Sequence, residues 1–241
     1  METVVEIEHL KKSFGTNQVL KDISLKIEQG QNMVVFGKSG SGKSVLIKCL
    51  VGLLEPDEGK VVILGKDIIE LKNEELNVLR KKIGFLFQSA ALYDSMTVRE
   101  NLEFPLRDLR KKPQEEIDEL VLETLKSVGL EDAIDKMPSE LSGGMRKRVG
   151  LARTLILKPE IILYDEPTTG LDPITSKEIS HLILDIQKKY NASSIIITHD
   201  VECARITANK MVVLKGGICI AEGTFKELSE STEESVNSFF K

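Results

Sequence analysis

Residues 37–44 are Gly37-Lys38-Ser39-Gly40-Ser41-Gly42-Lys43-Ser44, the stretch that decides the fold of this chain. The stretch follows the apolar run Met33–Phe36 and precedes the helical pattern of Val45–Leu50, which predicts a strand, a loop and a helix in that order. In that context the pattern G-x-x-x-x-G-K-[ST] is typical of a phosphate-binding loop, whose glycines let backbone N–H groups face a phosphate. A chance glycine-serine loop is the alternative, and the strand and helix on either side weigh against it.

Two side chains of this stretch have chemical roles that glycine cannot fill. The Lys43 ammonium would place a positive charge at the β- and γ-phosphates of a nucleotide, and the Ser44 hydroxyl is a suitable Mg²⁺ ligand. The stretch therefore predicts a site for ATP with Mg²⁺. The residues of the stretch predicted to bind the nucleotide are Gly37, Lys38, Ser39, Gly40, Ser41, Gly42, Lys43 and Ser44.

Two adjacent carboxylates stand at the end of a second strand of the buried type. The apolar run Ile161–Tyr164 leads directly into Asp165 and Glu166, and Pro167 ends the strand. Asp165 is placed to hold Mg²⁺, usually through water, and Glu166 is placed to polarise an attacking water as a general base. Two acids at a strand end are by themselves more often solvated than catalytic. The phosphate-binding pattern upstream favours the catalytic interpretation.

A third element, Leu141-Ser142-Gly143-Gly144-Met145, opens a predicted helix that starts near Ser142. One side of that helix carries Met145, Val149, Ala152 and Ile156. A serine and two glycines at a helix start form a second place where a phosphate can bind. The alternative for Ser142 alone is a simple N-cap, and the run Arg146-Lys147-Arg148 is typical of a solvated helix face.

Composition limits the classes of protein to consider. The chain has 241 residues, 41% of them hydrophobic and 29% charged, as expected for a globular domain with a substantial core. The net charge of −5 gives no general electrostatic basis for binding nucleic acid, and no nucleic-acid partner is predicted. Cys49, Cys203 and Cys219 lack metal-ligand spacing and are expected to be reduced thiols in the core. No run approaches the ~18 apolar residues that span a bilayer, so a membrane role has to come from a partner protein.

Strand-like and helix-like patterns alternate along the chain, which predicts an α/β fold. From Ser89 to about Leu157 the pattern becomes mostly helical, and Gln114–Val128, ended by Gly129, is the clearest helix. Gly216-Gly217 between two apolar runs predicts a β-hairpin. The predicted strands are Val4–Ile7, Val19–Ile27, Met33–Phe36, Val61–Leu64, Ile83–Phe87, Ile161–Tyr164, Ser194–Thr198, Met211–Leu214 and Ile218–Ala221.

Further positions make the chain resemble an ABC ATPase over nearly its whole length. Gln88 matches the Q-loop glutamine of that family, and Gly170-Leu171-Asp172-Pro173 is similar to its D-loop. His199 matches the switch histidine, and Phe14 stands where the family has an aromatic ring against adenine. Leu141–Met145 resembles the ABC signature, which most often ends in Gln. Taken singly, these residues would be ordinary polar, capping or core residues.

The resemblance implies a P-loop NTPase (RecA-like) core with an antiparallel β subdomain and an inserted helical subdomain. It implies one ABC ATPase domain over 1–241, with the core in 1–88 and 157–225, the helical signature subdomain in 89–156 and a short acidic tail in 226–241. It also implies a head-to-tail dimer of two copies of this chain. In that dimer, ATP on the phosphate loop of one copy is capped by the Ser142–Gly144 segment of the other.

The resemblance also assigns roles in ATP hydrolysis. Gln88 would sense the γ-phosphate and Mg²⁺, and Asp172 would link the two sites of the dimer. The residues predicted to take part in catalysis are Glu166, His199, Lys43 and Gln88. The predicted Mg²⁺ ligands are Ser44, Gln88 and Asp165. Beyond the phosphate loop, the residues predicted to contact nucleotide are Phe14, Gln88, Ser142, Gly143, Gly144, Asp165 and Asp172.

The segment from Gln88 to Leu106 is similar to the ATPases of Mla/MCE-type phospholipid transporters, as is the signature that ends in Met145. In the family this segment receives the coupling helix of the membrane permease. The side chains expected to line that groove are Leu92, Tyr93, Phe104 and Pro105. Packing inside the helical insert is an equal alternative for the first and third of them. At the end of the acidic tail, Phe239-Phe240 either docks on the partner subunit or is mobile.

The predicted function is that of an ATP-hydrolysing ABC transporter subunit on the cytoplasmic face of the inner membrane, powering phospholipid movement through a separate permease. A small regulatory subunit is a further candidate partner. Three alternatives share parts of the pattern: the ATPase of an amino-acid or ion importer, a soluble ABC ATPase without a permease, and a regulatory module that binds nucleotide without hydrolysis. Intact Glu166 and His199 argue against the last of these.

Overall fold

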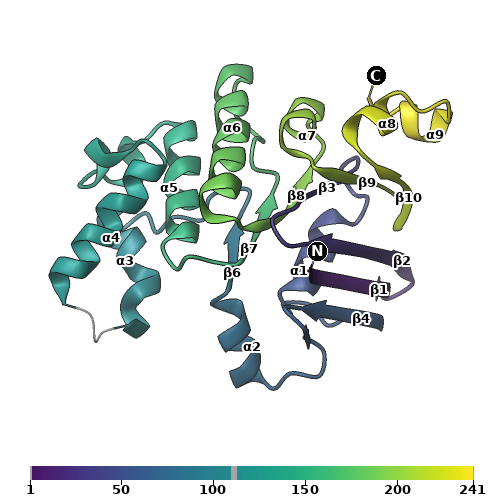
Figure 1. Cartoon of the computed structure of the whole chain (residues 1–241), viewed down its shortest axis with the longest axis horizontal. Helices are drawn as coiled ribbons and strands as arrows, with labels where there is room; N and C mark the ends of the chain where they lie inside the picture. The colour runs from purple at the N-terminus through teal and green to yellow at the C-terminus, as the bar shows by residue number, and fades with distance from the viewer. Residues whose placement is uncertain (1, 110–112, 241) are drawn as a thin grey trace.

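The computed structural model describes residues 2–109 and 113–240. They form a mixed sheet in the strand order β5-β4-β1-β2-β10-β9-β3-β8-β7-β6, with helices packed on both faces (Figure 1). The predicted domain ends, residues 1 and 241, lie outside the described residues, as do residues 110–112. The α/β class predicted from the alternating patterns is confirmed.

Five neighbouring strands of this sheet run parallel to one another. In spatial order they are β9 (Lys210–Lys215), β3 (Asn32–Phe36), β8 (Ser193–Thr198), β7 (Ile161–Asp165) and β6 (Ile83–Leu86). The carboxyl ends of parallel strands lie along one edge of a sheet, which is where open α/β sheets bind ligands. Four sequence motifs follow four of these strand ends directly, and they begin at Gly37, His199, Glu166 and Phe87.

The remaining strands form a mostly antiparallel part beside this core, as the resemblance implied, with one parallel pairing, between Ile218 and Asp22. They are β1 (Thr3–Phe14), β2 (Asn17–Glu28), β4 (Glu58–Ile63), β5 (Lys66–Asp67) and β10 (Ile218–Gly223). Strands β9 and β10 form the predicted hairpin, and its turn residues Gly216 and Gly217 have φ of +56° and +83°. A Cβ on Gly217 would lie 2.5 Å from the Val19 carbonyl oxygen, so glycine is required where this hairpin meets β2.

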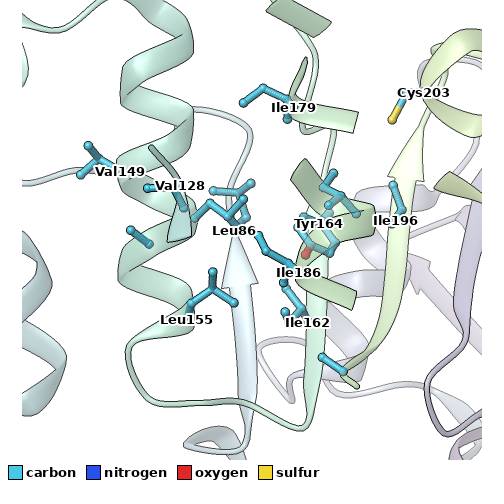
Figure 2. Close-up of a cluster of buried hydrophobic side chains, with 14 of the residues drawn as sticks. Leu86, Val128, Val149, Leu155, Ile162, Tyr164, Ile179, Ile186, Ile196 and Cys203 are labelled. Carbon is cyan, nitrogen blue, oxygen red and sulfur yellow. The ribbon is translucent and has the colours of Figure 1, made fainter. Parts of the chain in front are cut away.

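Side chains of the central strands alternate between two cores, because successive residues of a strand point to opposite faces. In β3, Val34 and Phe36 belong to one core, and Met33 and Val35 belong to the other. The first core lies under α5 (Gly143–Leu155) and α6 (Pro173–Tyr190), where fully buried Tyr164 packs among aliphatic side chains (Figure 2). The second core lies under α1 (Lys43–Leu50) and the antiparallel strands.

The chain between β6 and β7 is mostly helical, as predicted. It contains α3 (Val98–Glu103), the 3₁₀ segment Phe104–Leu109, α4 (Gln114–Ser127), the 3₁₀ turns Glu131–Ala133 and Pro138–Glu140, and α5. The other helices of the core are α2 (Asn73–Arg80), α6 and α7 (Val201–Thr207). Helix α2 and the short strand β5 had no counterpart in the sequence prediction. Among the described residues, no helix is long and apolar enough to cross a membrane.

The acidic tail folds back on the core as two short helices, α8 (Phe225–Ser229) and α9 (Glu234–Asn237). The Phe240 ring stacks on Phe36, the last residue of β3, with ring centroids 5.5 Å apart. It also meets Phe225 edge-on at 5.5 Å. Docking on a partner subunit and mobility were the two alternatives predicted for this aromatic pair; within the single chain the pair packs on its own core, and docking on a partner stays a prediction. The pair packs on its own chain because Phe36 and Phe225 offer an apolar surface there.

The thiols are expected to react slowly while the chain is folded. Burial raises the pKa of Cys49, Cys203 and Cys219 to about 11. At pH 8 the thiolate fraction would then be about one hundredfold below that of an ordinary thiol, and the thiolate is the reactive form. Labelling with a chromogenic disulfide should be slow in buffer and fast in denaturant. Rapid labelling of one thiol in buffer would show that the site is more open than the packing indicates.

Candidate active site

The phosphate-binding stretch joins β3 to α1 at the carboxyl edge of the sheet. Gly40 and Gly42 have φ of +79° and +104°, in the region that glycine adopts without strain. A Cβ added to Gly37 would lie 2.5 Å from the backbone oxygen of Leu214, so strand β9 leaves no room there for a side chain. The glycines therefore keep the backbone of this loop open to a ligand, as the sequence pattern predicts.

The Lys43 ammonium lies inside this loop. It donates hydrogen bonds to the backbone oxygens of Gly37, at 2.7 Å, and Lys38, at 3.1 Å. The Ser41 hydroxyl is buried and has no hydrogen-bond partner among the described residues. Buried polar groups are nearly always partnered, so this hydroxyl fits a site that a phosphate oxygen completes.

Glu166 brings three predicted catalytic residues together. One oxygen of its carboxylate lies 3.4 Å from the Lys43 ammonium, and the other lies 2.8 Å from His199 Nδ1. Both Glu166 and Lys43 are buried, with 8% and 5% of their surface exposed. The cluster forms because Glu166 and His199 directly follow the neighbouring parallel strands β7 and β8.

The backbone of Glu166 is strained. Its φ is +50°, a left-handed conformation that costs an ordinary residue about 1–2 kcal/mol. The Glu166 N–H donates to Ile197 of β8 at 2.9 Å, and the Glu166 carbonyl accepts from the Thr169 N–H at 3.2 Å. These bonds hold the conformation that aims the carboxylate at Lys43 and His199. Such strain is found where the surrounding structure over-determines a residue, most often at functional sites.

Asp165 is suited to a cation. Burial and the neighbouring Glu166 raise the pKa of its carboxyl, against the opposing charges of Lys43, Lys48 and Lys147. Its Oδ1 is buried and has no hydrogen-bond partner among the described residues. In the described part of the chain no group of three His, Cys, Asp or Glu side chains is arranged for a metal. Mg²⁺ in nucleotide sites uses one or two carboxylates together with phosphate oxygens and water.

The other predicted Mg²⁺ ligands lie on the same edge of the sheet. Gln88 follows β6 with an exposed side chain, and Ser44 is an exposed residue in the first turn of α1. Strands β6 and β7 are hydrogen-bonded neighbours, which places Gln88 beside the strand end of Asp165. The edge therefore presents a hydroxyl, an amide and one carboxylate for a cation.

Ser142 is the N-cap of α5, and its hydroxyl oxygen accepts a hydrogen bond from the Met145 N–H at 3.2 Å. The capping role considered from sequence is therefore present. Ser142 and Gly143 are exposed, and a Cβ on Gly144 would lie 2.6 Å from the Thr175 methyl carbon. Close packing against α6 thus explains why position 144 is a glycine.

Asp172 caps the neighbouring helix α6. Its Oδ1 accepts from the backbone N–H groups of Ile174 and Thr175, both at 3.0 Å. The starts of α5 and α6 lie together, and α5 is on the far side of α6 from α1 in Figure 1. Across the described residues, no hydrogen bond or ion pair joins Ser142–Gly144 to the phosphate loop. One copy of the chain therefore does not bring its two predicted phosphate sites together.

Phe14 ends β1, and 48% of its surface is exposed. It pairs with Asn17 at the start of β2. Farther along β2, Leu20 packs against the phosphate loop, since a Cβ on Gly42 would lie 2.8 Å from its side chain. The ring therefore stands exposed on a hairpin that touches the loop, as an adenine-stacking residue requires.

The residues predicted to line a permease groove divide into two sets. Leu92 packs against the first core, so the alternative of internal packing is correct for it. The rings of Tyr93 and Phe104 pack on each other with centroids 4.5 Å apart, and 41% of Tyr93 is exposed. These two rings form an aromatic pair in the segment that follows Gln88.

The expectation of a solvated face at Arg146-Lys147-Arg148 is wrong for Lys147, which is only 5% exposed. Its ammonium donates to the backbone oxygen of Gln88 at 2.5 Å and to that of Glu166 at 3.3 Å. Burial lowers its pKa, and the charges of Asp165 and Glu166 oppose that shift. A signal in the sequence could have indicated this burial. Gly150, Leu151 and Thr154 are small or apolar residues that share one side of α5 with Lys147 at helical spacing, which is typical of a packed face.

Comparisons with known proteins agree on one family for this chain. A family model described as ABC transporter matches residues 20–169. The probable ribonucleotide transport ATP-binding protein mkl of Mycobacterium leprae is 44% identical over 239 residues, 99% of this chain and 69% of that protein. The intermembrane phospholipid transport system ATP-binding protein MlaF of Haemophilus influenzae is 38% identical over 240 residues, 100% of this chain and 91% of that protein.

A solved structure agrees with this. It is a dimeric ATP-binding cassette in a post-hydrolysis state bound to ADP and Pi, with TM-score 0.82 and 34% identity. The similarity covers 92% of this chain and 98% of that one. The chain spans about two thirds of the mycobacterial relatives' length, 69% and 66% in two of them. The matched residues include the phosphate loop, Ser142 and Glu166. The chain therefore belongs to the ABC transporter family, as an ATP-binding ATPase subunit of that family.

Proposed function

We propose that this chain binds ATP with Mg²⁺ on the Gly37–Ser44 loop and hydrolyses it with Glu166 as the general base. The observation that carries this proposal is the buried contact of Glu166 with Lys43 and His199, at 3.4 and 2.8 Å. A phosphate-binding lysine, a base and a second polar group meet at the end of one sheet, as phosphoryl transfer to water requires.

Each residue has a distinct task in that reaction. Lys43 and the loop N–H groups hold the β- and γ-phosphates and stabilise the charge that builds up on them. When ionised, Glu166 only accepts hydrogen bonds, so it can orient a water and take its proton. His199, held by Glu166, contacts the γ-phosphate from the neighbouring strand end. Catalysis then consists of positioning and charge stabilisation, without a covalent enzyme intermediate.

The Mg²⁺ ligands of this proposal are Ser44, Gln88 and Asp165. The unpartnered Asp165 Oδ1 supports the assignment, because a buried carboxylate oxygen without a donor is completed by a cation or its water shell. When bound, Mg²⁺ would neutralise charge on the β- and γ-phosphates.

The working form of the chain is a head-to-tail dimer. Ser142, at the start of α5, is exposed and lies away from the phosphate loop of its own copy. The helix start would cap the γ-phosphate held by the other copy, because its free N–H groups favour an anion. Asp172, beside it, would lie at the seam between the two sites. The division into a core in 1–88 and 157–225 and a helical subdomain in 89–156 belongs to the same proposal.

A mixing experiment tests whether sites are shared. Ser142→Arg and Lys43→Ala chains are each expected to be inactive, whereas their mixture should recover up to about a quarter of wild-type ATPase activity. Half of the dimers would be mixed, and each would hold one complete site of two. Mixing Lys43→Ala with Glu166→Gln is the matched control, because both changes damage the loop side and no complete site can form. No recovery in the first mixture would contradict a site built from two copies.

The chain would act as the motor of a transporter, attached through a separate permease to the cytoplasmic face of the inner membrane. The exposed ring of Tyr93 and the half-buried ring of Phe104 packed on it, in the Gln88–Leu106 segment, are the proposed contact for that permease. Phospholipid is the proposed cargo for two reasons. The whole chain is similar to MlaF, and its Gln88–Leu106 segment resembles that of phospholipid-transporter ATPases. The similarity to the ribonucleotide transport protein makes ribonucleotide the second candidate.

Affinity purification from native membranes decides between these cargoes and tests the permease. An integral membrane protein with bound phospholipid should co-purify with the wild-type chain and be lost with Tyr93→Ala. Bound ribonucleotide instead would overturn the phospholipid assignment. Recovery of the chain without any membrane protein would favour a soluble ABC ATPase.

A further inference from the structure

Lys147 occupies an unusual position for a lysine on a helix that carries exposed residues. It is 5% exposed, and its ammonium bonds to two backbone oxygens that are far apart in sequence, those of Gln88 and Glu166. An ammonium group has three donors, and removing it from water is costly unless those donors are used. Lys147 thus connects α5 to the loop after β6 and to the end of β7.

The bond to Glu166 acts on a strained backbone. Glu166 has φ of +50°, and its carbonyl accepts from both the Thr169 N–H and the Lys147 ammonium. The direction of the Glu166 carboxylate depends on that backbone conformation. A change in the position of Lys147 would therefore change how Glu166 faces Lys43 and His199.

The loop at Gln88 is held against the same helix by other contacts. A Cβ on Gly150 would lie 2.9 Å from the Ala90 Cβ, so helix and loop are in close contact. Arg153 donates to the Ala90 oxygen at 3.0 Å, and the Thr154 hydroxyl donates to the Phe85 oxygen at 3.2 Å. Helix α5 and residues 85–90 are therefore held together by these contacts.

Arg153 and Lys147 differ in what they reach. Both are cations of α5, both are removed from solvent, and both bond to the loop after β6. Among the hydrogen bonds described for α5, only the Lys147 ammonium reaches the residue that carries the base. Replacing Arg153 therefore weakens the attachment of the loop to α5, whereas replacing Lys147 also removes the connection to Glu166.

We propose that Lys147 is a positioning residue for ATP hydrolysis: its ammonium joins the loop at Gln88 to the strand end that carries Glu166. The inference rests on the proposed function of Glu166 as base. Lys147 does not touch the reacting atoms. It holds the Glu166 backbone in the conformation that aims the carboxylate, and it makes that conformation follow the loop at Gln88. A partner that displaces the loop would thereby change the rate of hydrolysis.

The test compares three variants of the full chain in steady-state MgATP hydrolysis. Lys147→Met keeps the length of the side chain and removes its donors, and kcat should fall about tenfold or more while KM for ATP changes less than about threefold. Lys147→Arg restores charged donors and should recover kcat to within about threefold of wild type. Arg153→Met is the matched control, because it loses the bond to the loop and the contact with the Tyr93 ring but no bond to Glu166, and its kcat should stay within about threefold.

Thermal unfolding and nucleotide affinity are measured on the same samples. If Lys147→Met fails to fold, Lys147→Leu takes its place, with a shorter apolar side chain that also has no donor and should also lose kcat. Wild-type kcat in a folded Lys147→Met or Lys147→Leu chain would overturn the inference alone, and an equal loss in Arg153→Met would do the same. Wild-type chain that binds ATP but hydrolyses none would overturn the proposed function, and the inference with it.

Discussion

Replacing Glu166 with glutamine is expected to lower kcat for ATP hydrolysis about 10²- to 10³-fold while ATP binding is retained. The amide has the size of the carboxylate and fits between Lys43 and His199, which lie 3.4 and 2.8 Å from its oxygens. It cannot take a proton from water, so the base is lost and the phosphate-binding loop is kept. Stable ATP-bound dimers should then accumulate.

Single-turnover hydrolysis and nucleotide affinity measured on the same protein separate these two effects. Glu160→Gln is the matched control, since Glu160 is an exposed acid just before β7 that pairs with Lys82 at 2.8 Å. Wild-type turnover in Glu166→Gln would remove Glu166 from the role of base. A loss of ATP affinity equal to the loss of turnover would instead assign it to binding.

Lys43→Ala is expected to weaken ATP binding about 30- to 1000-fold, which corresponds to about 2–4 kcal/mol for a buried charge that loses its partner. Lys43 is 5% exposed, so its ammonium would meet the phosphates with little screening by water. The change also removes the cation next to the buried Glu166 carboxylate.

Calorimetric titration with ATP in the absence of turnover measures this effect. Lys48→Ala, an exposed lysine in the last turn of the same helix, is the control and should bind ATP with nearly wild-type affinity. Unchanged affinity in Lys43→Ala would show that the loop backbone alone holds the phosphates. The thermal midpoint should be compared as well, because a buried carboxylate without its cation is destabilising.

The sequence predicted the parts of the site that depend on local geometry. The Gly37–Ser44 pattern identified a strand, loop and helix, and the run into Asp165 and Glu166 identified a strand end. The Gly216-Gly217 turn predicted its hairpin because φ above zero is a property of the turn itself.

The parts that were missed depend on which strands become neighbours. Lys147 is buried because β6 lies beside β7, which brings Gln88 and Glu166 within reach of one ammonium. Nothing in the run Arg146–Arg148 specifies that sheet order. The packing of Phe240 on Phe36 was missed for the same reason, since it joins the end of β3 to the tail across the fold.

The left-handed backbone of Glu166 has a consequence for how this chain would respond to selection. At φ of +50°, glycine or asparagine would relieve the strain that glutamate bears. The same change would remove the ion pair with buried Lys43, so a directed-evolution experiment that rewarded heat resistance alone would enrich those residues at position 166 only in variants where relief of the strain exceeds that loss. The recovered variants would be more robust and inactive. The φ angle of Glu166 thus favours activity at the expense of heat resistance. A screen for improved chains therefore has to reward both properties at once.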